Sequence, residues 1–308
     1  MSASSDRPRL GFVGLGVMGY PMAGHLAKAG YEMTVFDASP AAIDRLREVH
    51  PSVTVAATPA AVGAAADIVV TMLPDGQVVQ QVALGPGGLI ETMRSGSLLL
   101  DTSSAQPWLT LATAAALAER GIGMIDAPVS GAQWGAEQAN LVFMVGGASD
   151  DVARVRPILD LLGRAVFHCG PLGSGHIMKS INNTITAMTF LATAEGLALG
   201  KRAGLDPVAM NDVLNESTGG SWITVNHIPQ RILSRTFDDP FRLELMLKDV
   251  KIAAQLARDY ELPLPFAAHC ERVYEQAHAF AGTGKSLSEL VRWVEHDTGV
   301  EITPGGAE

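Results

Sequence analysis

A glycine-rich turn that joins a short apolar strand to a helical segment restricts the fold of this chain more than any other feature. The strand is predicted over 10–14, and the turn that follows it has the order Gly14, Leu15, Gly16, Val17, Met18, Gly19. In such a turn the first glycine permits the tight bend, the second lets the backbone approach a pyrophosphate, and the third lets helix and strand pack closely. The pattern therefore predicts a dinucleotide-binding unit, with the phosphates at the helix N-terminus.

The rest of the first half alternates strand and helix patterns. Further strands are predicted over 33–37, 53–56, 67–73, 97–103, 124–130, 140–147 and 166–170, with helices at 17–30, 41–49 and 107–120. The strands are rich in Val, Ile and Leu at successive positions, which is typical of strands buried between two helix layers. We therefore expect an α/β fold that begins with a Rossmann domain, a doubly wound parallel sheet.

Strand patterns stop after the segment 166–170, and the second half reads as helices alone. One long helix is predicted over 176–203, and shorter ones over 206–216, 241–260, 265–281 and 286–297. We expect a Rossmann domain over 1–172, joined by the long helix to an all-α domain over 173–308 that serves substrate binding and oligomerisation. The longest connection, 217–240, is expected to be a functional loop.

Charge, hydropathy and cysteine spacing argue against nucleic acid, membranes and metal ions as binding partners of this chain. The 308 residues carry 22 Lys and Arg against 32 Asp and Glu, a net charge of −10, so a nucleic-acid partner is not expected. No stretch reaches the roughly 20 apolar residues of a membrane span, and the first ten residues have no apolar leader, which predicts a cytoplasmic protein. Cys169 and Cys270 lie far apart without metal-ligand spacing, so reduced thiols and no metal are expected.

The second predicted strand ends at Asp37, eighteen residues after Gly19. A carboxylate at this position can accept hydrogen bonds from both ribose hydroxyls of a dinucleotide. The same charge repels the 2′-phosphate that distinguishes NADP, so we expect NAD as the cofactor in preference to NADP.

The ends of the next two predicted strands also face a cofactor in a fold of this class. Leu73 and Pro74 are expected on the adenine-ribose side, and Ser104 near the nicotinamide. The competing interpretation is that both segments are ordinary turns, in which Asp101 and Ser103 serve as capping residues before a helix.

Several motifs in the order of a known family make the chain resemble the β-hydroxyacid dehydrogenases, which include 3-hydroxyisobutyrate dehydrogenase. The glycine-rich segment 12–26 is similar to the family's N-terminal signature, and DAPVSGA at 126–132 to its substrate-binding segment. The segment 173–183 resembles the catalytic helix, LKD at 247–249 a late element, and Gly-Ser-Trp at 220–222 a tryptophan-bearing loop. The resemblance runs from residue 9 to about 297, nearly the whole chain.

The resemblance implies an active site with assigned roles. It gives the catalytic role to Lys179 and cofactor contact to Lys248. It gives substrate contacts to four residues that lie in the matched motifs: Ser130, Gly131, Asn183 and Asp249. Two departures touch the substrate pocket. Ala132 replaces the last glycine of the family's SGG triplet, and His227 replaces a tyrosine often found five residues after the loop tryptophan.

The residues themselves support the same chemistry. Lys179 and Asn183 are four residues apart, so both project from one face of the predicted helix. Burial in an apolar cleft lowers a lysine pKa from about 10.4 towards the 7–8 that suits proton transfer. Ser130 and the N–H groups that follow it, at Gly131 and Ala132, form a plausible anion nest for a substrate carboxylate.

Four other residues near these motifs have ordinary alternatives. Trp222 could wall the substrate pocket, although a lone tryptophan is more often part of a core. Lys248 could neutralise the carboxylate and Asp249 could orient it, although an isolated Lys-Asp pair is usually a surface ion pair. For His176, one turn before Lys179, we expect a helix-capping or surface role in preference to a proton relay.

The expected function is NAD-dependent oxidation of the hydroxyl group of a small β-hydroxy acid. The candidates are 3-hydroxyisobutyrate, ranked first, then serine, glycerate, threonate and hydroxymethylglutarate. One alternative is a reductase of a small semialdehyde of the tartronate or succinate type. Another is a non-catalytic cofactor-sensing or scaffold module, against which the presence of Lys179 and Asn183 argues. A homodimer or homotetramer is expected.

Overall fold

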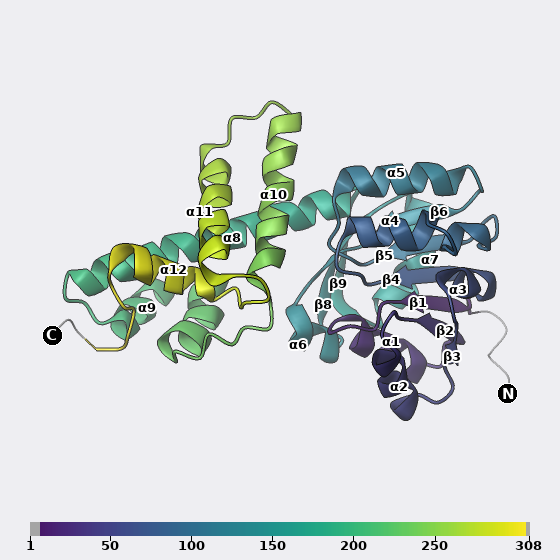
Figure 1. Ribbon diagram of the computed structural model, residues 1–308, viewed down its shortest axis with the longest axis horizontal. Helices are drawn as coiled ribbons and strands as arrows, with labels where there is room; N and C mark the ends of the chain where they lie inside the picture. Colours follow the sequence, from purple (N-terminus) through teal and green to yellow (C-terminus); the bar gives the residue numbers. More distant parts are fainter. Residues whose placement is uncertain (1–6, 306–308) are drawn as a thin grey trace. The chain divides into compact units, whose positions relative to one another are not determined.

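The computed structural model describes residues 7–305 and divides into two compact units between Lys179 and Ser180. The first unit holds all the strands of the described residues, and the second is helical (Figure 1). The predicted α/β class with a helical second half is therefore confirmed.

Six parallel strands form the main part of the sheet. They lie in the order β3 (Thr54–Val55), β2 (Met33–Phe36), β1 (Leu10–Val13), β4 (Ile68–Thr71), β5 (Leu98–Asp101) and β6 (Gly123–Asp126). This 3-2-1-4-5-6 order is the one found in dinucleotide-binding sheets. Ligands of such sheets bind beyond the carboxyl ends of the strands, so the strand ends matter most for function.

The remaining strands are β7 (Val129–Ser130), β8 (Leu141–Gly146) and β9 (Gly163–Gly170). β8 runs antiparallel to β6 and β7, and β9 pairs parallel with β8. The sequence predicted a single strand over 124–130, and this was wrong because Ala127 and Pro128 separate β6 from β7. Proline cannot donate to a strand ladder. After the break, the chain leaves the parallel pairing with β5, and β7 continues the antiparallel pairing with β8 that begins at Asp126.

Helices cover both faces of the sheet, as the alternating pattern requires (Figure 1). One core contains residues of α1 (Gly19–Lys28), α2 (Pro40–Val49) and α7 (Ser149–Leu159); the other contains residues of α3 (Pro59–Ala65), α4 (Gly76–Leu84) and α5 (Pro107–Ala118). Adjacent residues of one strand divide between them, because Phe12 belongs to the first core and Val13 to the second. Two short helical segments complete the unit, η1 (Leu89–Glu91) and α6 (Ala132–Glu137).

The long predicted helix is α8 (Ser174–Arg202), and the division between the units falls within it. The second unit also contains α9 (Pro207–Asn215), α10 (Leu243–Asp259), α11 (Pro265–Ala281) and α12 (Glu289–Thr298). Its core includes Phe190 and Tyr274, and the Tyr274 hydroxyl donates to the Ala187 carbonyl at 3.1 Å. Burial raises the pKa of Tyr274 well above its usual range and that of the Cys270 thiol to about 12.

The connection 217–240 is not the simple loop that the sequence predicted. It contains a π-helix, η2 (Ile223–Leu233), which the Ser221 and Thr224 side chains stabilise at its start by hydrogen bonds to each other's backbone. π-helical turns occur often at functional sites. Among the helices of the described residues, none has the length and apolar character required to cross a bilayer.

Candidate active site

The glycine-rich turn has the geometry that a pyrophosphate requires. Gly14 has a φ of 99°, and a Cβ there would collide with the Met72 carbonyl. A Cβ at Gly19 would collide with the Gly14 carbonyl oxygen, whereas nothing lies within 4 Å of the corresponding position at Gly16. The first and third glycines therefore serve the turn and its packing. At Gly16 the space beside the backbone is open to a ligand, so the residues present fit NAD.

Asp37 is bonded to this turn directly. Its Oδ2 accepts the Leu15 N–H at 2.6 Å, and its Oδ1 accepts the Ser39 N–H at 2.7 Å. Each carboxylate oxygen retains a lone pair for a ribose hydroxyl. Leu15 is fully buried, while Val17 is exposed and Met18 half-buried.

Arg45 is a cation beside the same turn that sequence reasoning missed. Its guanidinium lies 3.8 Å above the Tyr20 ring, and Nη2 donates to the Leu15 carbonyl at 3.5 Å. Arg45 and Asp37 therefore bind the two backbone groups of one residue. No local pattern marks Arg45, because it lies within α2 and is brought to the turn only by folding.

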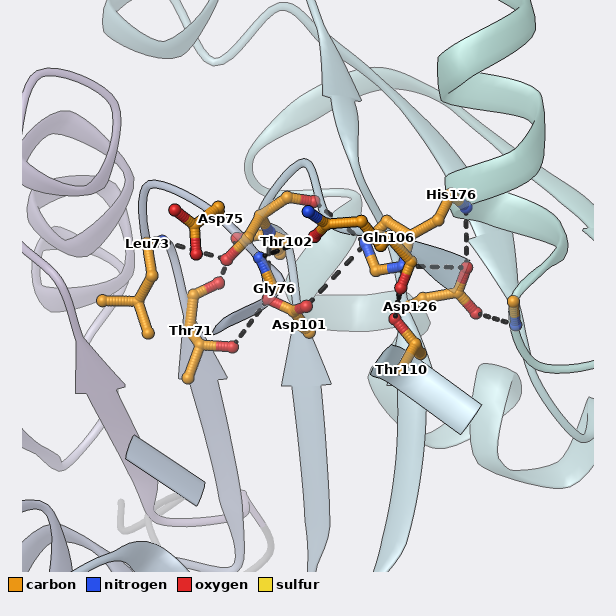
Figure 2. Close-up of polar contacts among 12 residues, drawn as sticks. Thr71, Leu73, Asp75, Gly76, Asp101, Thr102, Gln106, Thr110, Asp126 and His176 are labelled. Carbon is orange, nitrogen blue, oxygen red and sulfur yellow. Dashed lines mark hydrogen bonds and ion pairs between the residues drawn. The ribbon is translucent and has the colours of Figure 1, made fainter. Parts of the chain in front are cut away.

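The ends of β4 and β5 are bonded to each other, as Figure 2 shows. The Leu73 N–H donates to Ser103 Oγ at 2.9 Å, and the Thr71 hydroxyl donates to Asp101 Oδ1 at 2.9 Å. Pro74, one residue after Leu73, is exposed, and Ser104, one residue after Ser103, is half-buried. The two segments with predicted cofactor contacts are therefore fixed relative to each other.

The alternative interpretation of Asp101 and Ser103 as helix caps was wrong. α5 begins at Pro107, with Gln106 at its N-cap position. Asp101 is fully buried, and its Oδ1 also accepts the Ser103 N–H at 3.1 Å. Both residues thus belong to a buried polar cluster at the strand end.

Asp126 and His176 join this cluster at the start of α8 (Figure 2). Asp126 is fully buried, with Oδ1 accepting the Gly173 N–H at 2.7 Å and Oδ2 accepting the His176 N–H at 2.8 Å. It therefore caps α8 from another element. A Cβ at Gly175 would collide with the Met144 carbonyl oxygen, so this close approach requires glycine.

The expectation of a capping or surface role for the His176 side chain was wrong. The residue is 1% exposed. Its Nε2 lies 3.0 Å from the Ser103 carbonyl oxygen, and its Nδ1 lies 2.9 Å from Thr110 Oγ1. The burial could not be predicted from the helix pattern, because it depends on the strand ends against which the helix packs.

The predicted anion nest has an unusual backbone. Ser130 ends β7, Gly131 has a φ of 132°, and Ala132 opens α6 with a φ of 52°. A left-handed alanine is disfavoured by roughly 1–2 kcal/mol. Ala139, with a φ of 51°, has the same strain just after α6 ends. Gly131 and Ala132 are both exposed, so their backbone is accessible.

Lys179 is partly buried in α8, and Asn183 follows one turn later. The second unit brings Asn183, Lys248 and Asp249 together. Asn183 Nδ2 donates to Asp249 Oδ2 at 2.5 Å, and Lys248 Nζ lies 2.8 Å from Asp249 Oδ1. The side chains of Lys248 and Asp249 are 19% and 2% exposed, so the interpretation as a surface pair was wrong.

Trp222 directly precedes η2 and His227 lies within it, and their environments are very different. Trp222 is 65% exposed, which excludes the ordinary role in a core within the described residues. His227 is buried, with Nδ1 3.0 Å from Asp239 Oδ2 and Nε2 3.0 Å from Ser288 Oγ. Both ring nitrogens are therefore used within the second unit, where they hold η2 to the residue that precedes α12. The described residues contain no group of His, Cys, Asp and Glu side chains suited to a metal.

Comparisons with known proteins agree with this arrangement. A family model described as the NAD binding domain of 6-phosphogluconate dehydrogenase matches residues 9–170. A second one, described as NAD-binding of NADP-dependent 3-hydroxyisobutyrate dehydrogenase, matches residues 173–294.

The similar proteins include enzymes with several named substrates. The chain is 33% identical to 2-(hydroxymethyl)glutarate dehydrogenase of Eubacterium barkeri, over 96% of this chain and 98% of that protein. It is 38% identical to an NAD-dependent L-serine dehydrogenase of Pseudomonas aeruginosa, over 81% of this chain and 85% of that protein. A structure of Mycobacterium tuberculosis 3-hydroxyisobutyrate dehydrogenase with L-serine has a TM-score of 0.86 at 29% identity, covering 94% of this chain and 99% of the other. The chain therefore belongs to the β-hydroxyacid dehydrogenase family and is an NAD-dependent oxidoreductase that acts on the hydroxyl group of small hydroxy acids.

Proposed function

We propose that the substrate is a β-hydroxy acid of the 3-hydroxyisobutyrate type and that Lys179 is the general acid/base. NAD supplies the hydride acceptor when bound. The chain's own residues must then remove the hydroxyl proton and hold the carboxylate. The relatives named above are dehydrogenases of 2-(hydroxymethyl)glutarate, L-serine and 3-hydroxyisobutyrate, which are all β-hydroxy acids, and this supports the substrate class.

The observation that carries this proposal is the buried side-chain arrangement around Asn183. Asn183 is 6% exposed, and its amide donates to Asp249. Its Oδ1, which accepts from Asn182 Nδ2 at 3.0 Å, retains a second lone pair. On the same helix, one turn earlier, stands Lys179. An oriented amide oxygen at this spacing can hold an ammonium group or a substrate hydroxyl in a fixed position.

For the carboxylate, we propose Ser130 and the backbone N–H groups of Gly131 and Ala132. Both residues are exposed and have positive φ angles at the start of α6, which supports N–H groups that a carboxylate can reach. Lys248 would contact the cofactor, Asp249 would orient Asn183, and Trp222 would wall the substrate pocket. The exposure of the Trp222 side chain supports this last role.

The decisive experiment is Lys179→Ala with steady-state kinetics. We expect kcat to fall by about 10³, since general acid/base groups contribute roughly 10²–10⁴. The Kd for NAD, measured by fluorescence titration, should change little, because the glycine-rich turn and Asp37 remain intact. Near-normal turnover in this variant would refute the role of Lys179.

A substrate panel tests the class and the direction. NADH absorbance would be followed with 3-hydroxyisobutyrate, L-serine, glycerate, threonate and 2-(hydroxymethyl)glutarate, and in reverse with tartronate and succinate semialdehydes. We expect the highest kcat/KM for 3-hydroxyisobutyrate with NAD. A semialdehyde with the higher value, in the reductive direction, would make the protein a reductase.

We also propose the following organisation: a Rossmann domain over 1–172, a helical domain over 173–308, a homodimer or homotetramer, and a cytoplasmic location. The limits of the two family matches support the domain division. Exposed apolar side chains in the second unit, among them Phe266 at 78% and Leu199 at 73%, support self-association. Two free cysteines suit a reducing compartment. Light scattering of the purified protein would measure the oligomeric state.

A further inference from the structure

We propose that His176 is a positioning residue, which sets the place of Lys179 relative to the segments that follow β4 and β5. The inference rests on the proposed role of Lys179. All the contacts that carry it lie within the first unit, and Figure 2 shows His176 beside Thr110 and Asp126.

Both nitrogens of His176 are used. A carbonyl oxygen only accepts, so Nε2 carries a proton that it donates to the Ser103 carbonyl at 3.0 Å. The Nδ1 bond to the Thr110 hydroxyl, at 2.9 Å, anchors the ring to α5. The imidazole is thus fixed in orientation by two elements that are distant from α8 in sequence.

The bonds form a continuous connection from the cofactor side to the helix. The Leu73 N–H donates to Ser103 Oγ, and the Ser103 carbonyl accepts from His176. Lys179 follows His176 by three residues, which is about 4.5 Å along the helix axis and nearly the same face. A change at His176 therefore shifts the turn that carries Lys179 relative to both strand ends.

The first turn of α8 has two kinds of anchor, since its backbone is held at the end of β6 and the His176 side chain is held by Ser103 and Thr110. Asp126 already accepts the backbone N–H groups of Gly173 and His176. The side chain is surrounded instead by buried charge, with Asp101 Oδ2 3.7 Å from Nε2 and Asp126 Oδ2 3.7 Å from Nδ1. Within the described residues Asp101 Oδ2 has no hydrogen-bond partner. A polar ring at this place costs desolvation, which favours a role in positioning over one in stability.

Two substitutions of His176 test the hydrogen bonds of its two ring nitrogens one at a time. In His176→Gln the amide nitrogen reaches the position of Nε2 and keeps the bond to Ser103. In His176→Asn the shorter amide reaches only the position of Nδ1 and keeps the bond to Thr110. We expect kcat within threefold of wild type for Gln and a loss of about 10- to 100-fold for Asn, with KM for NAD unchanged in both, since displacements near 1 Å can cost about 10².

Thr110→Val is the matched control for the other nitrogen. It removes the hydroxyl without changing the shape of the side chain, so kcat should fall less than in His176→Asn. Equal kcat in the Gln and Asn variants would overturn the proposal. A loss of kcat in proportion to the loss of Tm across the three variants would also overturn it, because that correlation indicates a purely structural role.

A double-mutant cycle with Lys179→Ala tests whether His176 acts through the lysine. If it does, His176→Asn has no further effect on the residual rate of Lys179→Ala. Independent, multiplicative losses would overturn the positioning role while leaving the function of Lys179 intact. Retention of turnover by Lys179→Ala alone would instead refute the proposed function, so the two failures are distinguishable.

Discussion

The glycine-rich turn and the Asn183–Asp249–Lys248 cluster are built in opposite ways. The turn depends on the backbone and on the absence of side chains within six consecutive residues, and the side chains of Asp37 and Arg45 reach it from other segments. The cluster uses buried side chains from α8 and α10, which are 66 residues apart in sequence at Asn183 and Asp249. A local site that is made of backbone groups can be predicted from the spacing of its residues in the sequence. A site made of buried side chains depends on the packing of distant helices.

Of the effects that this contrast predicts, the largest is the loss of kcat in Asp249→Ala, which should be smaller than that in Lys179→Ala. Removal of the carboxylate deprives Asn183 of the group that orients it, and Lys248 of its close counter-charge, so kcat should fall by about 10². Asp249→Asn keeps an oxygen for the Asn183 amide and is the matched variant. It should lose less activity in the same steady-state assay. Equal losses would show that charge, and not orientation of Asn183, is what matters.

The glycine turn predicts two separable effects. Gly16→Ala places a methyl group in open space, so the free energy of unfolding should be nearly unchanged while KM for NAD rises by about tenfold or more. Gly19→Ala collides with the Gly14 carbonyl and should destabilise the protein by about 3 kcal/mol in denaturant unfolding. The reverse result would mean that Gly16 is a structural glycine.

A smaller effect is expected for cofactor preference. Asp37→Ala removes the carboxylate that repels a 2′-phosphate, and Arg45 remains beside the turn, so the ratio of kcat/KM for NADP to that for NAD should rise by about tenfold. The double variant with Arg45→Gln should recover less NADP activity. An unchanged ratio in Asp37→Ala would contradict the assigned role of Asp37.

The smallest effects concern the two strained alanines. Ala139→Gly relieves a left-handed alanine outside the proposed nest, so it should raise the free energy of unfolding by about 1 kcal/mol without changing kinetics. Ala132→Gly should give a similar gain and also alter KM for the hydroxy acid. A change in KM with Ala139→Gly would show that the whole of α6, and not its first turn alone, shapes substrate binding.

The sequence predicted most of the fold, because its signals are local. The apolar strands, the helix patterns and the turn at Gly14 needed no tertiary information. Pro128, within a predicted strand, was the available signal for the break between β6 and β7. The π-helix within 217–240 had no comparable signal, because its start depends on side-chain bonds between Ser221 and Thr224.

The candidate site was predicted only in part, for a related reason. The residues of the glycine turn and of the lysine-bearing helix follow from spacing and from the family resemblance. The burial of His176, Asp101 and Asp249 does not, because each was assigned the commonest environment of its residue type. Buried polar groups are exceptions that only a folded structure can reveal.

The position of Asp126 has a consequence for redesigning this protein. The residue ends β6 and holds the first turn of α8, while the proposed carboxylate nest begins only four residues later at Ser130. Libraries intended to admit bulkier acids can vary the segment after Pro128, but they should leave Asp126 untouched. A position that must be kept and positions that can be varied therefore lie within a few residues of each other in the chain.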